Sequence, residues 1–306
     1  MVIGISNMKH AKAAEAFARA VIPAAGLGTR LLSATKEQPK EMLPLFATSE
    51  RNTLCLKPTV QLIFEQLFDF GIREFYFIVG RGKRALEDHF TVDRDYINRL
   101  NVNGRNVQAL DSFYDRIDKS TIVWVNQPEP KGFGDAVHQT RRLIGDNPFL
   151  VHAGDTYILS NHESIFSRML NLHTSTGADV TLAIKEVQDP RQYGVAEAHE
   201  HEGHLDIQRV EEKPREPKTH LAMMPLYIFD HGIFEAIENI APDKSGEIQL
   251  TDAIQDMIVT GRRVKAVKLL PDDIRLDVGT PETYWYALEE SHKHANHSKM
   301  NPSPER

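Results

Sequence analysis

A glycine-rich stretch that begins after residue 23 carries the residue types that hold a chain of phosphates. Glycines beside an apolar run let backbone N–H groups approach phosphate oxygens closely. Arg30 adds a planar guanidinium that can pair with two oxygens, and Lys40 adds a further positive charge. The stretch predicts a nucleoside triphosphate site, with nucleotide-binding positions at Ala24, Ala25, Gly26, Gly28 and Thr29.

Two other phosphate-binding patterns do not fit this stretch. A dinucleotide fingerprint requires a third glycine where Leu31 stands, and a P-loop requires Gly-Lys-Ser or Gly-Lys-Thr after the second glycine. A glycine turn among solvated charges would explain the two glycines alone, but not the arginine and lysine that follow. We therefore favour the triphosphate site.

Further polar residues stand where apolar runs end. Gln127 and Asp155 each follow such a run directly or within two residues. A glutamine amide offers both a donor and an acceptor, which matches one edge of a pyrimidine imide, and Gly132 leaves room beside it for a flat base. Asp155 with Asp277 offers the one or two carboxylates that Mg²⁺ accepts together with substrate phosphates and water.

Apolar runs alternate with helical patterns over the first two-thirds of the chain. This alternation predicts an α/β fold whose mainly parallel sheet is covered by helices on both faces. Ligand sites in such folds lie at the carboxyl ends of the strands, so Gly26, Gln127 and Asp155 are expected to meet in one cleft. The predicted strands are 21–25, 74–79, 121–126, 149–153 and 179–187, and the predicted helices are 9–20, 57–70, 83–90, 135–143 and 164–173.

We expect a single domain over residues 21–290. Residues 1–20 are predicted to form an N-terminal extension that is largely helical. Residues 291–306 are rich in Ser, His, Asn, Lys and Pro, and they are predicted to form a frayed polar tail.

A series of short sequence blocks resembles the UTP–glucose-1-phosphate uridylyltransferases, the bacterial-type UDP-glucose pyrophosphorylases. The blocks occur in that family's order and span about residues 21–290. Related thymidylyltransferases share the glycine-rich stretch but usually lack the second and the last block. The blocks are GLGTR at 26–30, KEMLP at 40–44, GRGKR at 80–84, EDHF at 87–90, KGFGDAV at 131–137, EKP at 212–214 and GEIQLTDAI at 246–254.

The resemblance implies the nucleotide-diphospho-sugar transferase fold, a Rossmann-like three-layer sandwich with a central mixed, mainly parallel sheet. It also implies uridylyl transfer from UTP to glucose 1-phosphate or a related sugar 1-phosphate, with Mg²⁺ as cofactor and pyrophosphate as the second product. It assigns uracil binding to Gln127 and Gly132, sugar-phosphate binding to Gly194, Glu212 and Lys213, catalysis to Arg30, Lys40, Asp155 and Lys213, and metal binding to Asp155 and Asp277.

The chain departs from the family pattern in two places. Residues 46–56 form an insertion before Lys57-Pro58, which is expected to be a surface elaboration or to border the cleft or an interface. Pro225 stands where a glycine near the sugar is expected, and proline has no N–H to donate. The identity of the sugar is therefore left open.

Two alternatives to a UDP-glucose enzyme stay open at this point. One is a glucose-1-phosphate thymidylyltransferase, or an enzyme that accepts both UTP and dTTP. The other is a non-catalytic subunit that binds nucleotide-sugars. The complete set of Arg30, Lys40, Asp155 and Lys213 argues against the second alternative, because a sensor need not keep every charge.

Composition excludes several other classes of protein. A net charge of -7 over 306 residues argues against nucleic-acid binding. No apolar run approaches the roughly 18 residues of a membrane span. The single cysteine, Cys55, suits a reducing cytoplasm. We expect a cytoplasmic homo-oligomer, a dimer or tetramer, in which His199, His201 and His204 belong to a hairpin tip rather than to a metal site.

Overall fold

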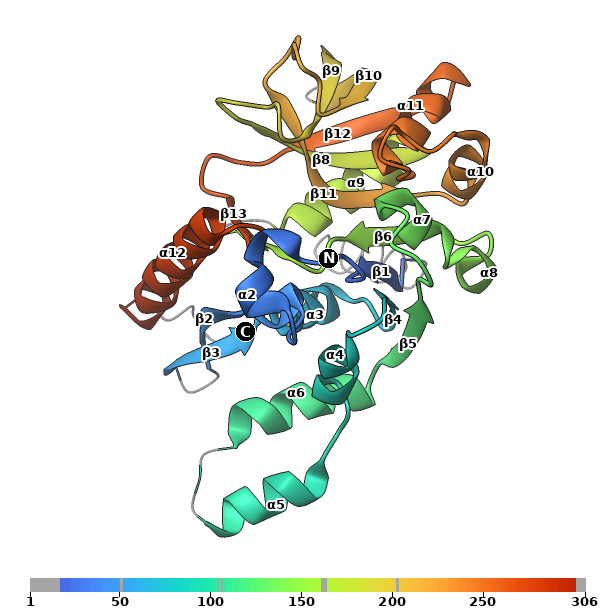
Figure 1. Cartoon of the computed structure of the whole chain (residues 1–306). Coiled ribbons are helices and arrows are strands. Elements are labelled where there is room, and N and C mark those ends of the chain that lie inside the picture. Colours follow the sequence, from blue (N-terminus) through green and yellow to red (C-terminus); the bar gives the residue numbers. More distant parts are fainter. Residues whose placement is uncertain are drawn as a thin grey trace, which may run out of the picture.

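The computed structural model describes residues 17–49, 52–103, 105, 107–160, 164–201 and 204–300, with side chains described up to residue 296. Its centre is a nine-stranded sheet in the order β5-β4-β1-β6-β11-β8-β12-β10-β9, with helices packed on both faces (Figure 1). The strands of this sheet are β1 Arg19–Pro23, β4 Glu74–Val79, β5 Thr121–Asn126, β6 Phe149–His152, β8 Val180–Glu186, β9 Gly194–His201, β10 His204–Glu212, β11 Leu221–Phe229 and β12 Val264–Lys268.

The two halves of the sheet differ in strand direction. β5, β4, β1 and β6 are parallel neighbours, and β8 is parallel to β12. β11 runs antiparallel to both β6 and β8, and β10 runs antiparallel to β12 and β9. The mixed sheet is therefore confirmed, and its longest run of parallel strands surrounds β1, after which the glycine-rich stretch begins.

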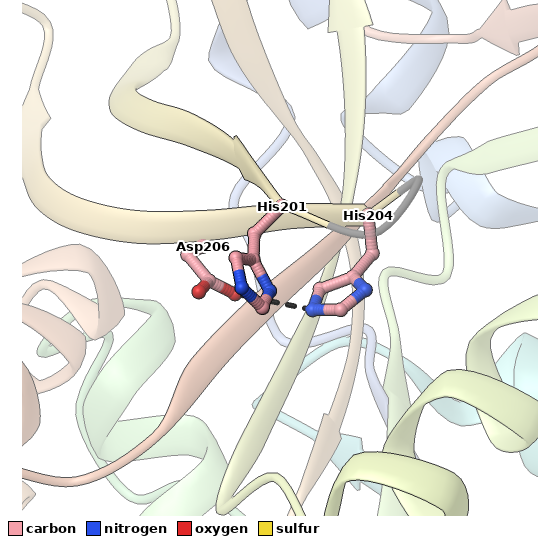
Figure 2. Close-up of side chains that lie close together, drawn as sticks. All are labelled: His201, His204 and Asp206. Atoms are coloured by element: carbon pink, nitrogen blue, oxygen red, sulfur yellow. Dashed lines mark ion pairs between the residues drawn. The ribbon is translucent and has the colours of Figure 1, made fainter.

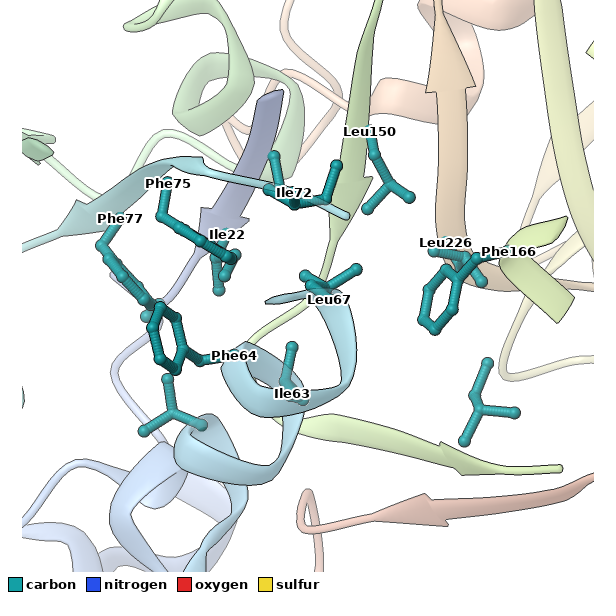
Figure 3. Packing of buried hydrophobic residues seen from close by; sticks show 14 of the residues in the cluster. Ile22, Ile63, Phe64, Leu67, Ile72, Phe75, Phe77, Leu150, Phe166 and Leu226 are labelled. Carbon is teal, nitrogen blue, oxygen red and sulfur yellow. The ribbon is translucent and has the colours of Figure 1, made fainter. Parts of the chain in front are cut away.

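Alternate residues of the strands point into two separate cores, which gives the fold three layers. On β1, Ala20 and Ile22 join one core, whereas Val21 joins the other. This follows from the two-residue period of a strand. Figure 3 shows the first core, where Phe64 packs beside Phe75 with ring centroids 4.6 Å apart.

The longer helices cover the sheet. The first core is closed by α3 Thr59–Phe70, α6 Gln108–Asp118 and α9 Ile165–Thr176, and the second by α7 Phe133–His138, α10 Gly232–Asn239 and α11 Leu250–Val259. The remaining helices are α2 Leu32–Thr35, α4 Arg84–His89, α5 Arg94–Val102, α8 Arg141–Ile144, α12 Pro281–Met300 and the short 3₁₀ helices η1 Thr29–Leu31 and η2 Lys40–Met42. Among the described residues, no helix is long and apolar enough to cross a membrane.

Two helix predictions need correction. The helix predicted over 135–143 is broken between α7 and α8, where the Thr140 hydroxyl donates to the Val137 carbonyl oxygen at 2.7 Å. The helix predicted over 9–20 is wrong at its end, because β1 begins at Arg19 and buries Ala20 between neighbouring strands. Pairing within the sheet thus overrides the helix preference of alanine there. Residues 9–16 lie outside the described residues.

The polar tail predicted from residue 291 is helical as far as Met300, since it continues α12. Ser291 and Ala295 are buried there against a two-stranded sheet of β2 Pro44–Thr48 and β3 Leu54–Pro58. The Phe46 backbone N–H donates to Ser291 Oγ at 3.2 Å, and Thr48 Oγ1 donates to the Ala295 carbonyl oxygen at 3.1 Å. The described inserted residues, 46–49 and 52–56, therefore belong to a two-stranded sheet against which α12 packs. Residues 301–306 lie outside the described residues.

His152 is a fully buried histidine at the end of β6. Its Nδ1 lies 2.9 Å from the Ala153 carbonyl oxygen, while its Nε2 has no hydrogen-bond partner among the described residues. Burial lowers the pKa of His152 to about 4, because a charged imidazolium would lose its water without gaining a partner. The fold therefore holds this side chain neutral.

We expect the free energy of unfolding to fall with acidification between about pH 6.5 and pH 4. In this range His152 becomes protonated in the unfolded chain but stays neutral in the folded chain. This difference lowers the free energy of unfolding by up to about 3 kcal/mol. Urea unfolding across this pH range should show a shallower decline for His152→Phe than for the wild type. The exposed His220→Phe serves as the control and keeps the wild-type decline. Equal declines in the wild type and His152→Phe would contradict the assignment.

Candidate active site

A cleft of about 890 Å³ opens at the carboxyl ends of β1, β5 and β6 and continues past the base of the β9–β10 hairpin. The structure brings almost all of the predicted site residues to its walls, although they come from distant parts of the chain. Those lining the cleft are Ala25, Gly26, Gly28, Thr29, Arg30, Lys40, Gln127, Gly132, Asp155, Gly194, Glu212, Lys213 and Asp277.

Ala24 is the exception among the predicted nucleotide-binding residues. Its side chain packs in the first core, and it is not among the residues that line the cleft. Its backbone N–H donates to the Ile78 carbonyl oxygen at 2.8 Å. Ala24 thus ties the glycine-rich stretch to β4, while its neighbours Pro23 and Ala25 line the cleft.

The glycine-rich stretch forms an exposed turn over one end of the cleft. Gly28 has a φ of +64°, a conformation that favours glycine, and a Cβ there would lie 3.2 Å from Thr35. A Cβ on Gly26 would face the ammonium group of Lys40 at 3.9 Å. Arg30 is exposed and has no ion-pair partner among the described residues. Its guanidinium is free to bind an anion.

Lys40 and Asp155 form an ion pair at the centre of the cleft. Burial alone would raise the pKa of Asp155, but the charges of Lys40 and Arg275 outweigh it and leave the pKa below its ordinary value. Burial alone would lower the pKa of Lys40, but Asp155 and Glu41 outweigh it and leave the pKa above its ordinary value. Both groups therefore stay charged.

A second ion pair involves the residue that follows Lys40 in the chain. Lys83 Nζ donates to Glu41 Oε2 at 2.9 Å, and both side chains are buried. Burial raises the pKa of Glu41, and the charges of Lys83 and Lys40 oppose that rise. Glu41 is the neighbour of Lys40 in η2, so this buried contact fixes the segment that positions Lys40.

Asp277 lies at the end of β13 Ile274–Asp277, which pairs with β7 Thr156–Leu159 beside the cleft. Arg275 Nη2 donates to Asp277 Oδ2 at 2.6 Å. The Gly279 N–H and the Thr283 hydroxyl donate to Asp277 Oδ1 at 2.9 and 3.0 Å. These donors fix the carboxylate in one orientation.

Asp155 and Asp277 approach each other closely enough to share a neighbour. The Thr156 hydroxyl oxygen lies 3.3 Å from Asp155 Oδ1 and 3.4 Å from Asp277 Oδ2. The register of β7 with β13 sets Thr156 opposite Asp277, which produces this arrangement. Two carboxylates beside an open phosphate site fit the oxygen ligands that Mg²⁺ prefers. Lys40 and Arg275 balance the negative charges of Asp155 and Asp277.

Gln127 is buried at the end of β5, with its amide held by two contacts. Nε2 donates to Asp135 Oδ2 at 2.7 Å and to the Gly132 carbonyl oxygen at 3.1 Å. A carboxylate accepts hydrogen bonds, so the NH₂ group has to face Asp135. No group among the described residues donates to Oε1, which is left as an acceptor. The cleft therefore offers a base one acceptor here, not the donor and acceptor expected from the amide alone.

Gly132 is required for close backbone packing as well as for the space that the sequence predicted beside a base. Its φ is +100°, and a Cβ would lie 2.7 Å from the Ile248 carbonyl oxygen and 2.9 Å from the Ile248 nitrogen. The Ile248 N–H donates to the Lys131 carbonyl oxygen at 2.7 Å. The Gly134 N–H donates to the Ile248 carbonyl oxygen at 2.9 Å. The missing side chain therefore makes room for the backbone of another segment, in addition to lining the cleft.

Glu212 and Lys213 lie where β10 ends, opposite the start of β9. Glu212 Oε1 pairs with Lys213 Nζ at 2.9 Å, and Glu212 Oε2 accepts from the Thr251 hydroxyl at 2.6 Å. A Cβ on Gly194 would lie 3.0 Å from Thr251 Oγ1 and 3.2 Å from Glu212 Oε2. The absence of a side chain at Gly194 thus leaves space for the side chains of Thr251 and Glu212.

Lys213 has a backbone conformation that is uncommon outside glycine. Its φ is +41°, and its N–H donates to the Tyr193 carbonyl oxygen at 3.0 Å. Strain of this kind persists where the surroundings fix it, and it occurs often at functional sites. The turn aims an exposed ammonium group at the cleft.

Pro225 lines the cleft and lies within an irregularity of β11. The register of β11 with β8 shifts between Met223 and Tyr227, so the sheet loses little from the missing proline N–H. Its carbonyl oxygen still accepts from the Ala153 N–H at 3.0 Å. The strand therefore accommodates the proline where a glycine was expected.

Sequence reasoning missed Arg275. Its guanidinium pairs with Asp277, lies 3.4 Å from the Tyr193 hydroxyl and is stacked over the Tyr193 ring at 5.4 Å. It joins the carboxylate side of the cleft to the turn before β9. The only sequence signal is its position two residues before Asp277 on the same face of a strand.

Comparison with known proteins identifies the family to which this chain belongs. The model of the nucleotidyl transferase family matches residues 19–294. The chain therefore belongs to the nucleotidyl transferase family. Within it the chain groups with the UTP–glucose-1-phosphate uridylyltransferases, as the sequence blocks indicated.

Two relatives and two solved structures illustrate this grouping. UTP–glucose-1-phosphate uridylyltransferase of Staphylococcus haemolyticus is 37% identical over 244 residues, covering 78% of this chain and 81% of that protein. A second such enzyme, from Staphylococcus saprophyticus, is 34% identical over 286 residues, covering 90% and 94%. Structures of UDP-glucose pyrophosphorylase match 91% of this chain and 99% of theirs at 32% identity, with TM-scores of 0.81 for the apo form and 0.77 for the complex with UDP-glucose.

We expect Lys40→Met to lower the free energy of unfolding near pH 7 by about 2 kcal/mol, because Asp155 loses its main partner and its side chain is only 21% exposed. The loss should shrink as the pH falls through the carboxyl range, since a protonated Asp155 no longer needs the ammonium group. Urea unfolding measures both effects. Lys36→Met, at an exposed lysine, is the control. Unchanged stability of Lys40→Met at pH 7 would contradict the pairing.

Proposed function

We propose that this chain transfers a uridylyl group from UTP to glucose 1-phosphate, producing UDP-glucose and pyrophosphate. The observation that carries the proposal is the set of groups that one cleft brings together. They are a free Arg30, the Lys40–Asp155 pair, an acceptor for a base at Gln127 and the Glu212–Lys213 pair. The relatives that bear the name of this activity support it.

The free oxygen of Gln127 supports a base that carries a ring N–H. Uracil and thymine both present N3–H to such an acceptor, whereas N3 of cytosine has no hydrogen. An extra methyl group on the base changes binding by about 1–3 kcal/mol in an apolar pocket. Gln127 therefore favours UTP and dTTP over CTP, and it leaves a relaxed UTP/dTTP enzyme as the alternative.

The reaction needs no protein nucleophile. An oxygen of the sugar phosphate attacks the α-phosphorus of UTP, the bond to the β-phosphate oxygen breaks, and pyrophosphate leaves on the opposite side. The second pKa of a phosphate monoester is about 6, so the attacking group is largely a dianion at neutral pH and needs no general base. Catalysis then consists of positioning and charge neutralisation.

Three cationic side chains would divide this work. Arg30 contacts the β- and γ-phosphates and stabilises the charge that collects on the departing pyrophosphate. Lys213 holds the acceptor phosphate in line, with Glu212 taking sugar hydroxyl groups. Lys40, in the same cleft, reduces the repulsion between the triphosphate and the acceptor.

Asp155 and Asp277 would hold Mg²⁺. When bound, Mg²⁺ supplies charge neutralisation and Lewis-acid polarisation of phosphate oxygens. Lys40 keeps Asp155 ionised, and Arg275 with Thr283 keeps Asp277 in one orientation. A cytoplasmic location and assembly into a dimer or tetramer stay predictions.

Pyrophosphate release with a panel of nucleotides and sugar 1-phosphates tests the proposal. In the presence of Mg²⁺, UTP with glucose 1-phosphate should react fastest among UTP pairs with glucose, galactose and N-acetylglucosamine 1-phosphates. CTP should react at least about 100-fold more slowly, because Gln127 Oε1 would face a lone pair. Omission of Mg²⁺ should abolish release.

Three outcomes of this panel separate the proposal from its alternatives. Preference for dTTP would identify a thymidylyltransferase. Binding of UDP-glucose without any pyrophosphate release would identify a non-catalytic subunit. Faster release with another sugar 1-phosphate would keep the reaction but reject glucose, which would direct attention to Pro225.

A further inference from the structure

Two histidines and an aspartate gather on one face of the β9–β10 hairpin, at the end of the molecule away from α5 and α6 (Figures 1 and 2). They are His201, His204 and Asp206, and one possible ligand atom from each lies within 4.8 Å of the other two. None of these residues lines the cleft described above.

The strand register creates this cluster. His201 lies directly opposite His204, and opposite residues of an antiparallel pair share a face. Asp206 follows His204 by two residues, so it points to that face as well. His204 Nε2 is 3.3 Å from Asp206 Oδ1, and the two imidazole centroids are 5.8 Å apart. Figure 2 shows the three side chains turned toward one another.

Two imidazoles and one carboxylate form a ligand set that zinc uses, with a fourth position left for water. A tetrahedral zinc ion with bonds of about 2.0–2.1 Å holds its ligand atoms about 3.4 Å apart. The pair His204–Asp206 already has this spacing. The ligand atom of His201 lies within 4.8 Å of the other two, and the exposed ring of His201 has room to rotate toward them.

Lys265 of β12 lies against two of the three possible ligand atoms. The register sets Lys265 opposite Asp206, and its Nζ contacts Asp206 Oδ1. The same Nζ lies 3.5 Å from His204 Nε2. An ammonium group beside two of the ligand atoms marks a place where positive charge is stabilised. It is also a competitor that a metal ion has to displace.

We propose that His201, His204 and Asp206 form a binding site for a zinc-class divalent metal ion, separate from the carboxylates of the cleft. Binding replaces the Lys265 ammonium, which withdraws on its flexible stem. Such an ion ties the free end of the hairpin together. The other end of the same hairpin carries Gly194 and Glu212 in the cleft, so the ion stabilises the strands that support the Glu212–Lys213 turn.

Titration with Co²⁺, whose visible absorption reports four-coordinate geometry, tests the site directly. The full chain is used without a polyhistidine tag and at a slightly alkaline pH, because metal ions compete with protons for their ligands. Excess Mg²⁺ occupies the oxygen ligands of the cleft and competes poorly for imidazole. We expect one Co²⁺ per chain, with strong visible absorption that Zn²⁺ abolishes.

Variants locate the ion and test the role of the lysine. His201→Ala and His204→Ala should each weaken Co²⁺ binding at least about tenfold. Lys265→Met should tighten binding, because the competing ammonium group is gone. His220→Ala, at an exposed histidine elsewhere, is the control and should bind as the wild type does. Circular dichroism confirms that each variant is folded.

Each contrary result would overturn the proposal. The first is a wild-type chain that binds no Co²⁺ in excess Mg²⁺. The second is unchanged affinity in both His201→Ala and His204→Ala, which would place the ion elsewhere. The third is weaker binding by Lys265→Met, which would mean that the lysine supports the site rather than competes for it. None of these results depends on the reaction in the cleft.

Discussion

The structure depends on the balance of charge between Lys40, Asp155, Glu41 and Lys83 at the carboxyl ends of β1 and β6. Each of these groups is wholly or largely removed from water, so each needs an opposite charge. The neighbouring backbone is adapted to them: a Cβ on Gly154 would lie 3.3 Å from Glu41 Cγ and 3.2 Å from the Pro23 carbonyl oxygen. A site that concentrates phosphates and carboxylates requires cations that are fixed in advance, and these pairs supply them.

The two ends of the cleft are linked by one short segment before and at the start of α11. Ile248 packs its backbone against Gly132 and Gly134, next to the loop that orients Gln127. Three residues later, Thr251 donates to Glu212 beside Lys213. The loop beside Gln127 and the Glu212–Lys213 turn are therefore held in place by the same piece of chain.

Features with a local signal could be predicted from the sequence, and features that depend on tertiary contacts could not. Gln127 and Asp155 were placed correctly because strand ends follow from periodicity. Arg275 has only a weak sequence signal, since its role comes from its contacts with Tyr193 and Asp277 in the folded protein. The composition of residues 291–300 resembles a tail, yet Ser291 and Ala295 are buried by β2 and β3. The sequence favours a hairpin tip over a metal site at the histidines, because the register that sets His201 opposite His204, with Asp206 on the same face, depends on strand pairing.

Asp155 is the carboxylate on which the proposed arrangement of the phosphates depends most. The most direct measurement is pyrophosphate release from UTP and glucose 1-phosphate by Asp155→Asn, beside its unfolding temperature. The amide keeps the shape of the side chain and an acceptor for Lys40 but removes the negative charge. We predict a loss of at least about 100-fold in kcat in a variant that is still folded at the assay temperature, although its unfolding temperature falls because Lys40 loses its opposite charge. Turnover close to that of the wild type would contradict it.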